Sequence, residues 1–86
     1  MTKTKLLNLH NFSTKNRTSI LKSKQCGCFS CLNIFAPDEI TDWSDENEEN
    51  IGQTALCPFC SVDSVLPDAE VEITVDTLKS MQEYWF

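Results

Sequence analysis

The sequence predicts a small α+β zinc-binding domain, in which a zinc-ribbon-like β-hairpin is combined with N-terminal, central short and C-terminal helices. Two observations support this prediction: the chain contains two Cys-x-x-Cys pairs, and it has only 86 residues. A chain of this length buries only about 60% of the surface that its unfolded form exposes, so its core needs further stabilisation. A metal ion shared by the two pairs would supply it.

The first residues carry no clear apolar period, and we expect residues 1–12 to be a flexible or loosely held arm. Their apolar cluster, Leu6 and Leu7 with Leu9, is too short for a signal-peptide core or a membrane span. We therefore expect the protein in the cytoplasm, where thiols are kept reduced and Cys-x-x-Cys pairs more often bind metal than form structural disulfides. Residues 13–86 should form a single zinc-stabilised domain.

A first helix is predicted over residues 14–24. Ser13 suits an N-cap, and Lys22 suits the negative end of the helix dipole. The apolar face is thin, since it consists of Ile20 and Leu21 alone. This helix must therefore lean on the rest of the protein or on a partner.

A short central helix is predicted next. Residues 37–39 place a proline before two carboxylates, which is a signal for the start of a helix. Ile40 and Trp43 are three residues apart and would share one face of that helix. Residues 44–53 are then rich in Asp, Glu and Asn, which is typical of an exposed acidic loop.

The C-terminal half is predicted to contain a hairpin, a strand and a helix. Two short segments flank a tight Cys-Pro-x-Cys turn within residues 53–66, and this pattern favours a hairpin with the metal at its tip. Alternating apolar residues over 71–75 indicate a brief strand. The last segment has the apolar spacing of a helix. One side of this helix would present Val75, Leu78, Met81 and Trp85.

The cysteine spacing is the most specific feature of the sequence. Cys28 and Cys31 form one pair, and Cys57 and Cys60 form the other. Two intervening residues let a tight turn present both sulfurs to one ion, and two such turns complete a tetrahedron of Zn–S bonds of about 2.3 Å. Pro58 would stiffen the second turn. The pattern predicts one structural Zn²⁺ with these four ligands.

Cys26 is a fifth thiol and a possible substitute ligand, but only one residue separates it from Cys28. Its alternatives are a small buried apolar residue or a redox-sensitive thiol. A thioredoxin-like redox pair is the main rival of the zinc site. That reading requires a parallel sheet for which this chain is too short.

The charges are segregated along the chain, and this suggests interaction surfaces. All basic residues but Lys79 precede Cys26, whereas all thirteen carboxylates follow it. We expect a non-enzymatic adaptor or regulator that binds another protein through its acidic face at residues 38–50 and through Trp43 or Trp85. The alternative is a nucleic-acid-binding module that uses basic residues of the first helix. Its phosphate-binding residues would include Lys15, Arg17, Lys22 and Lys24.

An enzyme is the third alternative. Its chemistry would depend on Asp63, Ser64 or the Cys26 thiol. Four thiolates close the coordination shell of zinc and leave no position for a catalytic water, so a catalytic metal is not expected. The single histidine, His10, is expected to be exposed or to cap a helix.

A further set of positions forms a recognisable pattern, which comprises Asn16-Arg17, Ser23, residues 26–31, residues 35–40, Trp43, residues 54–60, residues 63–65, Met81 and Trp85-Phe86. In this pattern the sequence resembles a family of small bacterial cytoplasmic proteins of unassigned function, over residues 13–86. The resemblance implies a cytosolic zinc-ribbon-like protein and implies no reaction. This chain has Ser61 where a glycine is expected after the second pair, and Ser30 where an aromatic residue is more usual.

Overall fold

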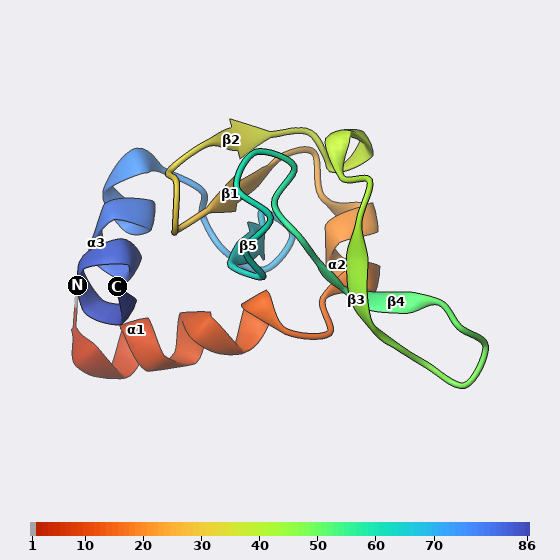
Figure 1. The fold of residues 1–86 in the computed structure, drawn as a ribbon. Helices are drawn as coiled ribbons and strands as arrows, with labels where there is room; N and C mark the ends of the chain where they lie inside the picture. Colours follow the sequence, from red (N-terminus) through yellow and green to blue (C-terminus); the bar gives the residue numbers. More distant parts are fainter. Residues whose placement is uncertain (1) are drawn as a thin grey trace.

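Two small antiparallel sheets and three α-helices make up residues 2–86, the part of the chain that the computed structural model describes (Figure 1). The helices are α1 (Lys3–His10), α2 (Arg17–Lys22) and α3 (Val75–Trp85). The first sheet has the order β2 (Ile34–Phe35), β1 (Cys26–Cys28), β5 (Val65–Pro67). The second pairs β3 (Trp43–Glu46) with β4 (Gly52–Ala55), and the short 3-10 turns are η1 (Asn11–Ser13) and η2 (Pro37–Glu39). The predicted α+β class is confirmed.

Strand β1 divides the interior into two apolar clusters. Because successive side chains of a strand point to opposite faces, Cys26 and Cys28 lie on one side of β1 and Gly27 on the other. A Cβ atom on Gly27 would lie 2.8 Å from Cδ1 of Leu78. Glycine at this position therefore lets α3 pack directly on the strand.

The first cluster lies between the sheet and the two long helices, α1 and α3. Helix α3 begins at a cap in which Thr74 Oγ1 accepts a hydrogen bond of 3.1 Å from the Thr77 backbone N–H. Leu78 and Met81 then lie in the cluster and Trp85 packs against it, as the sequence predicts, whereas Val75, which was expected on the same face, is 53% exposed at the first turn. The buried members of this cluster are Leu6, Leu9, Phe29, Leu66, Val71, Ile73, Leu78 and Met81.

The second cluster lies on the opposite face of the sheet and contains cysteines. Helix α2 contributes Ile20, which is fully buried. The other buried members come from the strands and the loops that follow them, and they are Cys26, Cys28, Phe35, Ile40, Ala55, Cys57 and Val65. Cys31 and Cys60 pack against them from a half-buried position.

The β3–β4 hairpin extends away from the rest of the domain (Figure 1). It is held to α2 by Arg17, whose guanidinium lies 4.6 Å from the ring centroid of Trp43 and donates a hydrogen bond of 2.8 Å to the Gly52 carbonyl. The residues from Asp45 to Asn50 are all exposed. The acidic loop predicted over residues 44–53 is thus a hairpin with an exposed acidic tip.

Asn16 joins three separate segments through one buried amide. Its Nδ2 donates hydrogen bonds of 2.8 Å to the carbonyls of both Phe12 and Val65. Its Oδ1 accepts a bond of 3.1 Å from the Ala55 N–H. Each buried backbone group would otherwise lack a partner, so this side chain stabilises the junction of η1, β4 and β5.

The N-terminal segment differs from the arm expected over residues 1–12. Residues 3–10 form α1, which is capped by a hydrogen bond from the Lys5 N–H to Thr2 Oγ1. Leu6 and Leu9 are three residues apart, on one side of the helix, and both are buried. Two leucines suffice here because α3 supplies the opposite surface, which the local sequence does not reveal.

The second helix begins later than predicted. Lys15 has a φ of 48°, in the left-handed region, and its N–H donates a 2.8 Å hydrogen bond to Thr54 Oγ1. This long-range bond prevents a helix that starts at residue 14. The predicted helix over residues 14–24 is therefore shortened to α2, and Leu21 is 62% exposed instead of packed.

The central helix predicted around residues 37–43 is only a single 3-10 turn, η2. It is closed when the Ala36 N–H donates a 2.7 Å hydrogen bond to the Glu39 carboxylate. The chain is then extended, and Trp43 begins strand β3, where it pairs with Ala55. Cross-strand pairing outweighs the local helix signal at this position.

The hairpin predicted within residues 53–66 is also corrected. Strand β4 pairs with β3, whereas β5 pairs with β1, so the segments on either side of the second cysteine pair belong to different sheets. The strand predicted over residues 71–75 does not form, although Val71 and Ile73 are buried. Their alternation reflects burial against the first cluster without strand pairing.

No helix within residues 2–86 combines the length and the apolar character that crossing a membrane requires.

Candidate metal centre

Two loops bring four cysteines together. The first loop runs from Cys28, at the end of β1, through Cys31 to strand β2. The second follows β4 and contains Cys57 and Cys60. We call residues 28–32 the first knuckle and residues 57–61 the second knuckle.

The first knuckle is a tight turn held by its own backbone. The Ser30 N–H donates a hydrogen bond of 3.3 Å to Cys28 Sγ, and the Leu32 N–H donates one of 2.9 Å to the Cys28 carbonyl. Leu32 adopts a φ of 66°. The Cys28 N–H donates to the Asn33 carbonyl at 3.0 Å, which closes the loop.

The second knuckle repeats this pattern bond for bond. The Phe59 N–H donates a hydrogen bond of 3.4 Å to Cys57 Sγ, and the Ser61 N–H donates one of 2.9 Å to the Cys57 carbonyl. Ser61 has a φ of 64°, and the Cys57 N–H donates to the Val62 carbonyl at 3.0 Å. Each knuckle thus directs backbone N–H groups at its first sulfur, as a thiolate requires.

The sulfurs of the two knuckles meet. Cys28 Sγ lies 3.6 Å from Cys60 Sγ, and Cys31 Sγ lies 3.6 Å from Cys57 Sγ. All four Sγ atoms lie within 4.8 Å of one another. A tetrahedron with Zn–S bonds of about 2.3 Å has S–S edges of about 3.8 Å. The donor set and its spacing therefore fit one tetrahedral ion, and the group could hold a metal.

The two sulfurs of the first knuckle accept hydrogen bonds from neighbouring side chains in different settings. The Ser64 hydroxyl lies 3.0 Å from Cys28 Sγ in a buried setting, and Asn33 Nδ2 donates a hydrogen bond of 3.2 Å to Cys31 Sγ at the surface. Ser64 is one of the residues considered for enzymatic chemistry, and it is 2% exposed. Asp63 beside it is exposed. When Cys28 is ionised, as a metal ligand is, the Ser64 hydroxyl would donate this hydrogen bond, a role that the sequence alone did not indicate.

The thiols of the cluster have different acidities in the absence of an ion. Burial raises the pKa of Cys57 to about 12, against the hydrogen bonds from the Phe59 and Cys60 N–H groups. Burial also raises the pKa of Cys28, partly offset by Ser64. Burial acts in the same direction on Cys31, but hydrogen bonds from the backbone and side chain of Asn33 and from neighbouring thiols bring its pKa down to about 7. Metal binding must therefore release protons from the buried thiols.

Cys26 lies outside the group of four. Its side chain is fully buried in the second apolar cluster, and burial, reinforced by the nearby Asp68 carboxylate, raises its pKa to about 12. A thiol with this pKa and no exposure is a poor nucleophile. The structure thus places Cys26 as a small buried apolar residue.

The basic and aromatic residues considered for binding have different surroundings. Arg17 and Trp43 contact each other within the domain, and both are half-buried. Lys22 is exposed at the end of α2. Trp85 packs against the first apolar cluster, with its ring centroid 4.1 Å from that of His10. Of these four binding candidates, only Lys22 is presented freely to solvent.

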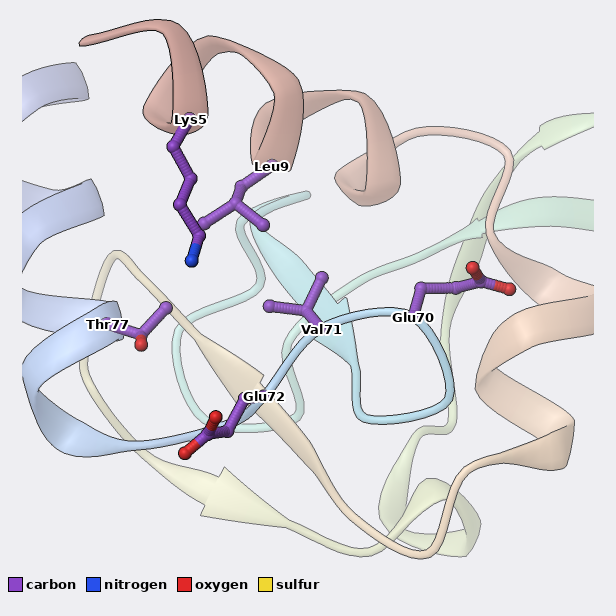
Figure 2. A pocket seen from close by; sticks show the side chains of 6 residues that line it. All are labelled: Lys5, Leu9, Glu70, Val71, Glu72 and Thr77. Atoms are coloured by element: carbon purple, nitrogen blue, oxygen red, sulfur yellow. The ribbon is translucent and has the colours of Figure 1, made fainter. Parts of the chain in front are cut away.

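A shallow cavity of about 200 Å³ lies between α1, the start of α3 and the segment after β5 (Figure 2). In Figure 2 the Lys5 side chain points into it, whereas the Glu70 side chain points toward α2. Glu70 there accepts a hydrogen bond of 3.2 Å from Ser19 Oγ. The lining residues are Lys5, Leu9, Glu70, Val71, Glu72 and Thr77, which include no cysteine or histidine. The cavity is therefore separate from the metal centre.

Comparison with family models, with curated proteins and with solved structures finds no match to this chain. No family is therefore identified, and the resemblance described above stays an expectation. The four-cysteine cluster is the firmest guide to function.

Proposed function

We propose that this chain is a cytoplasmic, non-enzymatic protein that holds one structural Zn²⁺ on Cys28, Cys31, Cys57 and Cys60. The observation that carries the proposal is the meeting of four sulfurs from two matching knuckles within 4.8 Å. Tetrahedral thiolate sites select zinc or iron, and zinc is the ion that closed four-cysteine sites of small modules hold most often. The reducing cytoplasm keeps such thiols available.

The arrangement favours a stabilising role for the ion over a catalytic one. Four thiolates fill the coordination shell, so no position is left for a water or a substrate. The ion would connect the end of β1 to residues 57–61 of the loop between β4 and β5, which lie outside the strands, whereas the end of this loop is already held by the pairing of β5 with β1. Zinc binding in small modules contributes about 10–16 kcal/mol, comparable to the whole stability of a domain.

Metal analysis tests this part of the proposal. Protein purified without added metal should contain about one zinc per chain, and chelation should abolish the cooperative thermal transition. Iron in place of zinc would correct the identity of the ion. A metal content near zero together with a fold that survives chelation would contradict the proposal.

We further propose that the zinc-supported domain binds another protein through the tip of the β3–β4 hairpin. The tip carries Glu46, Glu48 and Glu49 on exposed positions of an element that extends away from the domain. Arg17 and Trp43 fix the base of the hairpin and would hold its orientation. A partner with a basic surface fits this feature, because complementary charge accelerates and orients association.

A pair of matched variants tests the hairpin. Glu48→Gln with Glu49→Gln removes two charges from the tip, whereas Glu72→Gln with Glu83→Gln removes two exposed charges elsewhere. A partner recovered at stoichiometric amounts with the wild-type chain should be lost with the tip variant and kept with the control. Equal capture by both variants would contradict the assignment of the hairpin.

The other candidate functions receive less support. Nucleic-acid binding by the first basic helix would use Arg17, but its guanidinium already contacts Trp43 and the Gly52 carbonyl. A thiol-dependent enzyme would need an accessible Cys26, which is fully buried. Salt-sensitive binding of DNA or RNA that is lost on charge reversal at Lys22 would restore the nucleic-acid alternative.

A further inference from the structure

The four cluster sulfurs differ in their access to solvent. Cys28 and Cys57 are 0% and 2% exposed, whereas Cys31 and Cys60 are half-buried at the surface. Each half-buried sulfur lies 3.6 Å from a buried sulfur of the other knuckle. The cluster therefore contains two pairs, Cys31 with Cys57 and Cys60 with Cys28, and each pair joins an accessible sulfur of one knuckle to an inaccessible sulfur of the other.

We propose that the cluster is a peroxide-modification site, in which oxidation joins Cys31 to Cys57 and Cys28 to Cys60 and releases the metal. The inference rests on the metal-binding part of the proposed function and adds its regulation. The two knuckles that the ion connects would then be connected by covalent bonds. The chain would lose zinc without losing the junction between β1 and the second loop.

The chemistry is balanced with a peroxide as the oxidant. The accessible thiolate attacks one oxygen of H₂O₂, the O–O bond breaks, and the products are a sulfenic acid and hydroxide. The neighbouring buried thiolate then attacks the sulfenic sulfur, forms the S–S bond and expels a second hydroxide. Each disulfide thus consumes one peroxide and two electrons from two thiolates. The ion loses its ligands as the thiolates are consumed and leaves as Zn²⁺.

Both sulfur–sulfur contacts of 3.6 Å run between the knuckles, so we expect the disulfides to form between knuckles. A disulfide needs an S–S distance of about 2.05 Å, so each pair at 3.6 Å must close by a movement of under about 1 Å per sulfur. Within each knuckle a backbone hydrogen bond, from Leu32 N–H to the Cys28 carbonyl or from Ser61 N–H to the Cys57 carbonyl, fixes the turn. The intact knuckles therefore keep the partners from opposite loops in place.

Cys26, the fifth thiol, provides a control for the assignment of the disulfides. Cys26 is fully buried and lies outside the group of four, so we expect it to stay reduced. The Cys26→Ser variant retains all four cluster sulfurs and should respond to peroxide as the wild-type chain does. It also removes ambiguity when disulfides are assigned.

The experiment uses the full-length zinc-loaded chain. Zinc release on addition of H₂O₂ is followed with a chromogenic chelator, and the product is digested without reduction by trypsin and Asp-N. The sequence then yields one peptide over residues 25–37, with Cys26, Cys28 and Cys31, and one over residues 45–62, with Cys57 and Cys60. A bond between knuckles links these two peptides, whereas a bond within a knuckle leaves them separate.

We expect release of about one zinc per chain, a linked pair of peptides in both the wild-type chain and Cys26→Ser, and recovery of binding after treatment with a thiol reductant. Separate peptides, each lighter by two hydrogens, would overturn the inference while leaving zinc binding intact. Retention of zinc at peroxide levels that oxidise a free thiol would overturn it in the same way. Absence of zinc from the untreated protein would overturn the proposed function as well, so the two failures are distinguishable.

Discussion

The two knuckles share one backbone design but have different surroundings. In the first, Phe29 is 2% exposed and belongs to the apolar cluster under α1 and α3, and its N–H donates a 3.1 Å bond to the Ser64 carbonyl. In the second, the aromatic residue is Phe59, which stands one position later in its knuckle, where the first has Ser30; it is 58% exposed and contacts Phe35, with ring centroids 5.9 Å apart. The first knuckle is thus part of the hydrophobic core, whereas the second is attached mainly through its flanking strands and the cluster.

This difference indicates that the two knuckles are held in place by different interactions. The first knuckle is held by packing and strand pairing in addition to any ion, since β1 pairs with both β2 and β5. The second knuckle connects strands of two different sheets and gains most from an ion that fixes it to the first. Three of the following four pairs of changes compare the two knuckles at a ligand, at the aromatic residue and at the left-handed residue. The remaining pair compares the buried and the half-buried sulfur of the first knuckle.

Loss of a ligand should have the largest effect and should be equal on both sides. Cys28→Ser and Cys57→Ser each remove one of four thiolates, and each should abolish tight zinc binding and much of the roughly 10–16 kcal/mol that zinc contributes. Metal content after dialysis and the loss of a thermal transition by circular dichroism measure this. A variant that keeps one zinc per chain would show that its cysteine is not a ligand.

Truncation of the aromatic residue of each knuckle should give the largest difference in unfolding free energy between the two knuckles. Phe29→Ala removes a buried ring from the first cluster and should cost about 3–5 kcal/mol of unfolding free energy. Phe59→Ala removes an exposed ring and should cost less than about 1 kcal/mol. Denaturant unfolding of the two zinc-loaded variants gives the comparison. Equal losses would mean that the second knuckle is packed as tightly as the first.

The hydrogen bonds to sulfur should differ by burial. Ser64→Ala removes the hydroxyl 3.0 Å from buried Cys28 Sγ and should cost about 1.5–3 kcal/mol, with a zinc affinity lower by about 10- to 100-fold. Asn33→Ala removes the exposed donor to Cys31 Sγ, where water can replace it, and should cost less than about 1 kcal/mol. Competition with a zinc chelator measures both affinities. A larger effect at Asn33 would reverse this assignment.

The smallest effect is expected at the left-handed residue that ends each knuckle. Ser61 has a φ of 64°, so Ser61→Gly should relieve strain and stabilise the zinc-loaded chain by about 0.5–1 kcal/mol. Leu32 has a φ of 66°, but its side chain packs on the first cluster, so Leu32→Gly should destabilise. Midpoints of thermal unfolding show the signs. Stabilisation by both changes would mean that Leu32 contributes no packing.

The cluster was the most predictable part of the molecule, because its geometry is local. Each Cys-x-x-Cys turn is completed within five residues, so the spacing alone identifies which four cysteines meet. Ser61 was noted in the sequence as a departure from glycine, and its positive φ explains why a glycine is expected there. Whether the four sulfurs hold zinc in the cell stays a prediction until metal is measured.

The parts that were mispredicted depend on distant contacts. The leucines of α1 are buried only because α3 packs beside them. The left-handed conformation of Lys15 is stabilised by the hydrogen bond that its N–H donates to Thr54. Residues 37–43 carry a helix signal that pairing of Trp43 with Ala55 overrides. The strands around the second knuckle have ordinary hairpin spacing, but their partners lie in β1 and β3, which no local pattern identifies.

The amide of Asn16 has a consequence for folding kinetics. Its hydrogen bonds reach Phe12, Ala55 and Val65, which are 4, 39 and 49 residues away along the chain. The two long-range bonds form only after η1, β4 and β5 have come together, so they contribute to the native state more than to the transition state. Truncation at this position should therefore accelerate unfolding while it leaves the refolding rate nearly unchanged, and the amide would determine how long the assembled domain persists.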